Sequence, residues 1–307
     1  MRIAADRAPL EDGRAVRAES PWRRFAAEFA QSRLALLGLA LLVLLAAVAI
    51  AAPWIAPQNP YDLAQLDVLD SRLPPGSESL AGKTYWLGTD DQGRDMLSAI
   101  LFGLRISLTV GVASTVAALA LGLALGLAAA YFGGWLDAAI MRIADIQLSF
   151  PAILIALILL AALGQGVGKI IVALVTVQWA YYARTVRSAA LVERQKEYVE
   201  AAKVLALPEA RIVFRHILPN CLPPLIVVAT VQVAHAISLE ATLSFLGLGL
   251  PITEPSLGLL IANGFQYLLS GKYWISFYPG IALLVTIMAI NLVADQLRDV
   301  LNPRLKR

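Results

Sequence analysis

Residues 198–220, Tyr198-Val-Glu-Ala-Ala-Lys-Val-Leu-Ala-Leu-Pro-Glu-Ala-Arg-Ile-Val-Phe-Arg-His-Ile-Leu-Pro-Asn220, form a charged segment between long apolar stretches. The residues of Glu193–Leu205 are mostly strong helix formers, so a first helix is predicted there. The pair Leu207-Pro208 breaks it, because a residue that precedes proline disfavours the α region. Proline suits the first turn of a helix, so a second helix is predicted over Glu209–Ile217, ending near Pro219. The pattern therefore predicts a helix-break-helix unit.

The flanking composition is that of a membrane protein. Hydrophobic residues make up 59% of the 307 residues and charged residues 15%, whereas soluble domains are about half apolar and a quarter charged. A helix needs roughly 20 apolar residues to cross a bilayer. The sequence predicts six such spans, over Leu34–Ala52, Ile106–Phe132, Ile146–Gly164, Ile170–Ala183, Leu222–Leu239 and Phe277–Ala294. Gly122 and Gly126 indicate close packing of the second span, and Pro151 predicts a kink in the third.

The placement of Lys and Arg predicts the orientation, because basic loops remain in the cytoplasm. Seven arginines precede the first span, seven basic residues lie between 184 and 215, and four follow residue 297. With six spans these regions share one side, so both termini and the 198–220 segment are expected in the cytoplasm. The segment Tyr61–Asp95, with seven acidic and three basic residues, is expected outside. The pI near 9.0 thus reflects topology and not nucleic-acid binding. The first span exceeds a signal peptide's apolar core, so an uncleaved anchor is expected.

The chain offers little for nucleotide or metal chemistry. Gly82-Lys83-Thr84 lacks the upstream glycine of a phosphate-binding loop. Two histidines and the single cysteine, Cys221, have no metal-ligand spacing. Catalytic motifs such as GxSxG and HExxH are absent from the sequence. The sequence therefore predicts no catalytic residue, metal site or bound cofactor, and an intramembrane enzyme is disfavoured.

Five segments carry a family resemblance, and the first along the chain is the N-terminal Trp22-Arg-Arg-Phe25 with Ser32-Arg-Leu-Ala35. Glu200-Ala201-Ala202 is followed, fourteen residues after Ala202, by His216-Ile-Leu-Pro-Asn220, and this resembles the "EAA" loop of permease subunits in binding-protein-dependent ABC importers. Trp86-Leu-Gly-Thr-Asp-Asp-Gln-Gly-Arg-Asp95, Leu243-Ser-Phe-Leu-Gly-Leu-Gly249 and the ending from Asn291 to Arg304 are similar to the C-type permease of dipeptide, oligopeptide and nickel importers. The likeness covers nearly the whole chain from Pro21 onward.

The resemblance implies an all-α integral membrane protein with the type I ABC importer fold. It implies a B-type permease as heterodimer partner, two cytoplasmic ATPase subunits that bind ATP and Mg, and an extracytoplasmic substrate-binding protein. It leaves open whether the solute is a dipeptide, an oligopeptide, glutathione or a nickel complex. The residues implied to couple this chain to the ATPases are Glu200, Ala201, Ala202, Ala206, Leu207, Pro208, His216, Pro219 and Asn220. Ala201 and Ala202 are expected to offer a shallow docking face.

Ala206 departs from the family pattern, which has glycine six residues after the glutamate. Alanine with positive φ would be strained by about 1 kcal/mol. Because Pro208 already constrains Leu207, we expect the break to lie there and Ala206 to keep a negative, helical φ.

Four polar residues of the spans are candidates for the translocation path: Gln232, His235, Glu240 and Asn291. The rival function is a secondary transporter driven by an ion gradient, with His235, Glu240 or Asp295 as proton relay. His235 and Glu240 are five residues apart, so on a helix they point about 140° away from each other.

The predicted organisation has four parts. Residues 1–33 are a cytoplasmic tail, and 34–105 comprise the first span and the extracytoplasmic segment. Residues 106–303 are the core permease domain with the coupling loop at 193–220, and 304–307 are a cytoplasmic tail. Leu250–Ser276 is expected to be a re-entrant or surface segment outside the cytoplasm.

Overall fold

The computed structural model describes residues 21–62, 66–79 and 82–301, so the tail before Pro21 and the predicted tail at 304–307 lie outside the described residues. Its helices are α1 (Pro21–Phe29), α2 (Arg33–Ile55), α3 (Met96–Phe132), α4 (Gly134–Leu148), α5 (Ala152–Leu163), α6 (Val167–Arg194), α7 (Glu197–Val204), α8 (Glu209–Arg211), α9 (Leu218–Phe245), α10 (Leu257–Phe265) and α11 (Trp274–Leu301). Short 3₁₀ turns occupy η2 (Val68–Asp70) and η4 (Leu268–Ser270), and η3 (Ile212–Ile217) is a π-helical turn. Two-residue strands β1 (Ser77–Glu78) and β2 (Thr84–Tyr85) form an antiparallel hairpin.

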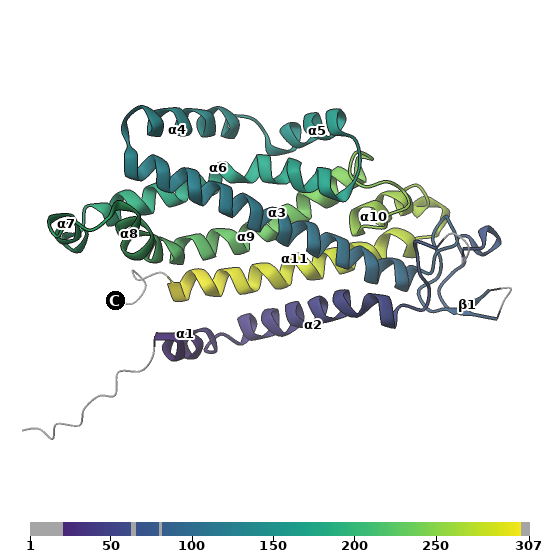
Figure 1. Cartoon of the computed structure of the whole chain (residues 1–307). Helices are drawn as coiled ribbons and strands as arrows, with labels where there is room; N and C mark the ends of the chain where they lie inside the picture. The colour runs from purple at the N-terminus through teal and green to yellow at the C-terminus, as the bar shows by residue number, and fades with distance from the viewer. Residues whose placement is uncertain (1–20, 63–65, 80–81, 302–307) are drawn as a thin grey trace, which may run out of the picture.

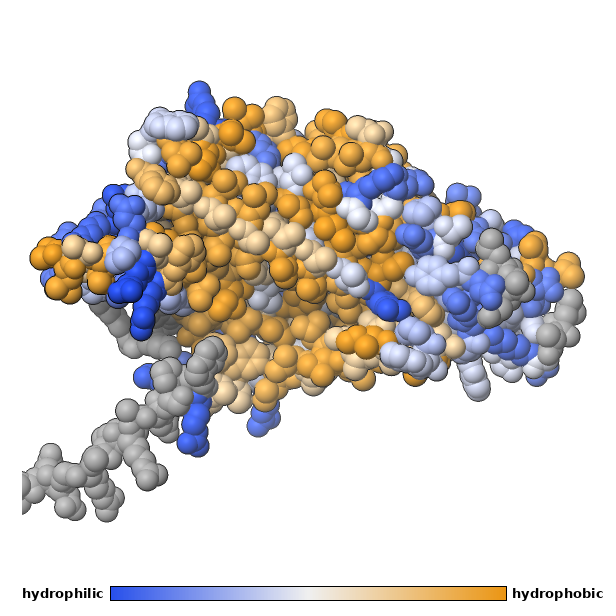
Figure 2. Space-filling model, in the orientation of Figure 1, coloured by the Kyte–Doolittle hydropathy of each residue, from blue (hydrophilic) through white to orange (hydrophobic). Residues whose placement is uncertain are grey.

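The long helices lie side by side along one direction, and the connecting segments gather at the two ends (Figure 1). One end holds α1, α7, α8 and the C-terminal end of α11, while the opposite end holds the β1 hairpin and α10. Apolar side chains cover the middle of the visible face, and hydrophilic ones gather at both ends (Figure 2). An apolar belt of this kind matches the hydrocarbon core of a bilayer.

Glycines bring the two central helices into contact. A Cβ at Gly122 of α3 would lie 2.6 Å from the carbonyl oxygen of Trp179 on α6, and one at Gly126 would lie 2.6 Å from that of Ala183. Any larger residue would push the helices apart. The predicted packing role of this glycine pair is confirmed.

The six predicted spans all fall on helices, but the third differs in form. Within the described residues, four helical stretches are long and apolar enough to span a membrane: α2, α3, the continuous run Glu209–Phe245, and α11. The third span is not one rod, because α4 and α5 meet at a bend of 92°. Pro151 precedes α5 as its N-cap and has no backbone N–H to continue α4, which explains the break at 149–151. α6 is 28 residues long, but its second half is rich in arginine.

The segment Leu250–Ser276 is not a surface loop. Leu257, Gly258 and Leu260 of α10 are buried, and α10 packs against α3, α9 and α11. The re-entrant alternative therefore describes it better.

Candidate functional site

The helix-break-helix unit is present, and we call residues 193–220 the ledge. α7, a turn at 205–208, α8 and η3 follow one another and lead directly into α9. Val199 and Ala202 of α7 pack into an apolar cluster with Ile212, Ile217 and Cys221. The ledge is thus held to the bundle by its own buried face.

The burial of Ala202 corrects the predicted docking face. Ala202 is only 4% exposed, because it lies three residues after the buried Val199 and therefore on the same side of α7. Glu200 and Ala201 are exposed. Only Ala201 of the alanine pair can meet another protein.

The outer side of the ledge carries large apolar side chains that nothing in the described chain covers. Val204 is 86% exposed, Leu205 73% and Phe214 64%. We call these three residues the apolar ridge. Leu207 is half-buried beneath it, and Pro208 is exposed. Exposed apolar patches on an otherwise charged surface mark interaction sites.

The predicted conformation of Ala206 is wrong. Its φ is +52°, in the left-handed region. The Leu207 N–H donates to the Ala202 carbonyl at 3.2 Å, and the Ala206 N–H donates to the Lys203 carbonyl at 2.9 Å. These two bonds form a Schellman motif, whose geometry requires a left-handed residue at the position of Ala206. The hydrogen bonds that close α7 therefore override the local cost of alanine.

We expect Ala206→Gly to stabilise the ledge by about 1 kcal/mol, because glycine adopts positive φ without strain. Ala201→Gly is the matched control, since Ala201 is exposed within α7 and glycine there weakens the helix by about 1 kcal/mol. Hydrogen exchange of the α7 amides measures both changes. If hydrogen exchange of the α7 amides changed in the same direction and to the same extent in both variants, the positive φ of Ala206 would be contradicted.

A polar junction fastens the start of the ledge to its end. The Tyr198 hydroxyl donates to the Glu193 carboxylate, and the Asn220 side-chain amide donates to the Tyr198 oxygen at 3.1 Å. The same amide nitrogen donates to the His216 carbonyl at 2.7 Å. Pro219 is exposed in the first turn of α9. His216 and Asn220 therefore hold the second half of the ledge in place.

The hydrogen bonds of the junction shift the pKa values of Tyr198 and Glu193. Burial and the bond to Glu193 raise the pKa of Tyr198 to about 12. Burial by itself raises the pKa of Glu193, but hydrogen bonds from Lys196 and Tyr198 outweigh it and hold that pKa below its ordinary value. The Glu193 contribution to stability is therefore present above its unfolded pKa and is lost as the pH falls through the folded value. The Tyr198 contribution is present below pH 10 and is lost as the pH rises through about 12.

Tyr198→Phe keeps the ring and removes the hydroxyl that joins Glu193 to Asn220. We expect the ledge to lose about 1 kcal/mol, seen as faster hydrogen exchange at 197–204 at pH 7. Tyr181→Phe serves as control, because Tyr181 is exposed on α6. Unchanged exchange in Tyr198→Phe would show that the junction does not hold the ledge.

The four path candidates separate into two groups. His235 and Asn291 are exposed, whereas Gln232 is 8% and Glu240 0% exposed. Ser238 and Thr242 continue the exposed side of α9 from His235 at helical spacing. A polar stripe within a membrane helix faces water or protein, because lipid contact is costly. Glu240 does not line a path in this structure.

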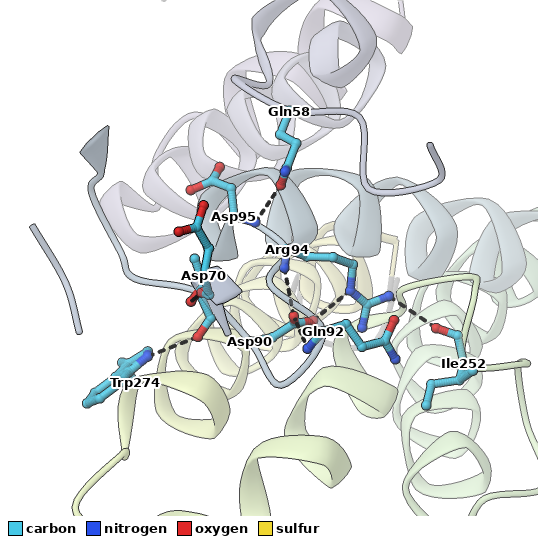
Figure 3. Close-up of polar contacts among 9 residues, drawn as sticks. Gln58, Asp70, Asp90, Gln92, Arg94, Asp95, Ile252 and Trp274 are labelled. Carbon is cyan, nitrogen blue, oxygen red and sulfur yellow. Dashed lines mark hydrogen bonds and ion pairs between the residues drawn. The ribbon is translucent and has the colours of Figure 1, made fainter. Parts of the chain in front are cut away.

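At the opposite end, the described residues of 57–95 (57–62, 66–79 and 82–95), here called the cap, contain a buried ion pair (Figure 3). The Arg94 Nε lies 2.6 Å from Asp90 Oδ2, and both side chains are almost fully buried. Arg94 also donates to the Ile252 carbonyl at 3.1 Å, and the Asp95 N–H donates to Gln58 Oε1 at 2.6 Å. The Trp274 indole N–H donates to the Thr89 carbonyl. The cap thereby joins α2, α3 and the α9–α11 region.

Sequence reasoning did not single out Glu193, Tyr198 or the Asp90–Arg94 pair as site residues. Asp90 and Arg94 lie in a turn before α3, so the four-residue spacing that pairs charges on a helix gave no signal for them. Within the described residues, no three His, Cys, Asp or Glu side chains are grouped so as to hold a metal ion.

Comparisons with known proteins match transport permeases along nearly the whole chain. Residues 122–307 match the family model of the binding-protein-dependent transport system inner membrane component, and residues 20–75 match the N-terminal TM domain of oligopeptide transport permease C. The dipeptide transport system permease protein DppC of Escherichia coli (strain K12) is 40% identical over 288 residues, covering 94% of this chain and 95% of that protein. DppC of Alkalihalophilus pseudofirmus is 36% identical over 289 residues, covering 94% and 92%.

A solved structure shares the fold. The MetNI methionine ABC transporter, in inward-facing conformations, matches with a TM-score of 0.55 and 21% identity, over 67% of this chain and 98% of that one. The predicted type I importer fold is confirmed. With the family model covering more than half of the chain, this protein belongs to the family of binding-protein-dependent transport system inner membrane components.

Proposed function

We propose that this chain forms half of the translocation pathway of an ATP-driven importer and that the ledge couples it to a cytoplasmic ATPase subunit. The apolar ridge carries the proposal, because Val204, Leu205 and Phe214 are exposed on a unit whose buried residues are anchored in the bundle. A B-type permease, two ATPase subunits and an extracytoplasmic binding protein complete the proposed assembly. ATP and Mg would be bound by the ATPases.

The polar stripe of His235, Ser238 and Thr242 is the proposed path surface. It needs a second permease to screen it from lipid. A gradient-driven relay has less support, since His235 is exposed while Glu240 is buried. The proposed substrates are di- and oligopeptides, because the relatives that match nearly the whole chain are named dipeptide transport permeases.

The proposed location is the bacterial inner membrane, with the ledge and both termini in the cytoplasm. The basic residues around the ledge support this orientation. Ser77→Cys, in a Cys221→Ala background, is expected to react with an impermeant maleimide in intact spheroplasts, whereas Ala201→Cys reacts only after lysis. The reverse pattern would overturn the orientation.

Reconstitution tests the function. The two permeases and their ATPases, in proteoliposomes, are expected to take up a labelled dipeptide only when the binding protein is outside and ATP is inside. Glutathione and a nickel complex are the competing solutes. Uptake of either one in preference to the dipeptide would refute the peptide assignment, and uptake without ATP would refute the importer.

A further inference from the structure

The carboxyl group of Glu240 is fully buried where α3, α9 and α10 meet. The Ser107 hydroxyl of α3 donates to Glu240 Oε2 at 3.0 Å, and the Ser244 hydroxyl donates to Oε1 at 2.8 Å. The Ser256 hydroxyl, which accepts from the Leu259 N–H at the start of α10, lies beside the same carboxyl group. We call Ser107, Ser244 and Ser256 the serine cage. One side chain of α9 thus bonds to α3 and lies against the start of α10.

The backbones around the cage are also in close contact. A Cβ at Gly258 of α10 would lie 2.4 Å from the Ala241 carbonyl oxygen of α9, and one at Gly103 of α3 would lie 3.1 Å from the Leu257 nitrogen. The start of α10 therefore lies directly against the backbones of both α9 and α3 beside the cage. If α10 or α3 moves, the carboxyl group loses a donor while it is buried from solvent, which is costly.

The cage lies at the far end of the helix that begins at the ledge. η3 continues without interruption into α9, which has 28 residues and is therefore about 40 Å long. Asn220 and the junction hold its first turn, and Glu240 holds its last turns. Pro223 and Pro224 lie near the start of α9, and the helix continues from them to Phe245. We treat this later part as the piece that moves as one body, with Glu240 holding its far end.

We propose that Glu240 is a positioning residue, which locks the far end of α9 to α3 and α10 so that movement of the ledge reaches the opposite side of the membrane undiminished. This proposal rests on the proposed function. Loss of the cage should leave the ledge and ATP hydrolysis intact, but let α9 move without carrying α3 and α10.

The first test measures the lock without any partner. Leu260 on α10 is fully buried, so Leu260→Cys, in a Cys221→Ala background, reports opening through its reaction with a maleimide in membranes. Ser107→Ala is expected to raise the labelling rate at least tenfold, and Ser107→Thr, which keeps the hydroxyl, to restore it. Thr230→Val is the control, since the Thr230 hydroxyl donates to the Ile226 carbonyl of its own helix. If Ser107→Ala left the labelling rate at residue 260 unchanged, or if that rate rose only in the control, the proposed role of Glu240 would be contradicted.

The second test uses the reconstituted complex and counts solute molecules taken up per ATP hydrolysed. For Ser107→Ala we expect this ratio to fall at least threefold while ATP hydrolysis stays within twofold, with recovery in Ser107→Thr. Parallel loss of uptake and hydrolysis, or an unchanged ratio, would contradict a positioning role. Absence of ATP-dependent uptake in the unaltered complex would instead refute the proposed function and leave the labelling result standing.

Discussion

Leu205→Asp is expected to weaken binding of the ATPase subunit severely, and to reduce ATP-driven uptake with it, while the chain still inserts in the membrane. Leu205 is 73% exposed, so its replacement costs the isolated chain little. In the proposed interface a carboxylate would be buried against an apolar surface without a partner. Central apolar contacts of this kind are worth about 2 kcal/mol or more, which corresponds to a loss of roughly thirtyfold in affinity. Co-purification of the ATPase subunits and uptake are the measurements.

Two further variants separate docking from packing. Leu269→Asp changes a fully exposed leucine of η4, at the opposite end, and should leave ATPase binding unchanged. Ala202→Arg, in contrast, places a charge inside the cluster that anchors α7, so we expect it to make the ledge sensitive to protease. Normal ATPase binding by Leu205→Asp would remove the apolar ridge from the interface.

Arg94→Leu is expected to destabilise the cap by about 3–5 kcal/mol, because it leaves the buried Asp90 carboxylate without its partner. Cleavage by added protease within residues 57–95, together with the steady-state level of the chain, reports the loss. Combining Arg94→Leu with Asp90→Asn should recover a large part of it, since the asparagine oxygen can still accept from the N–H groups of Gln92 and Arg94. Lys83→Met, which removes a single exposed hydrogen bond to the Pro57 carbonyl, is the control. An Arg94→Leu chain as resistant to protease as the control would contradict the role of the ion pair.

The sequence was sufficient for features that depend on local chemistry. Long apolar runs predicted the spans, Pro151 predicted the interruption of the third, and Pro208 predicted a second helical segment within the ledge. These features follow from hydrogen-bonding capacity and hydropathy, which each residue carries with it.

Features that depend on tertiary contacts could not be predicted in the same way. The burial of Ala202 depends on where the cluster around Ile212 and Ile217 forms. The left-handed Ala206 depends on two hydrogen bonds that end α7. Glu240 was a path candidate because it is ionisable and lies in a span. Its serine partners are Ser107 on α3, Ser244 on its own helix and Ser256 before α10. Spacing along α9 indicates Ser244, four residues after Glu240, but not Ser107 or Ser256.

The energy source of uptake tests the central claim most directly. In proteoliposomes that contain the complete complex, with ATP inside and binding protein outside, vanadate is expected to abolish dipeptide uptake and a protonophore to leave it unchanged. Uptake that survives vanadate but stops with the protonophore would contradict the account and identify a transporter driven by an ion gradient.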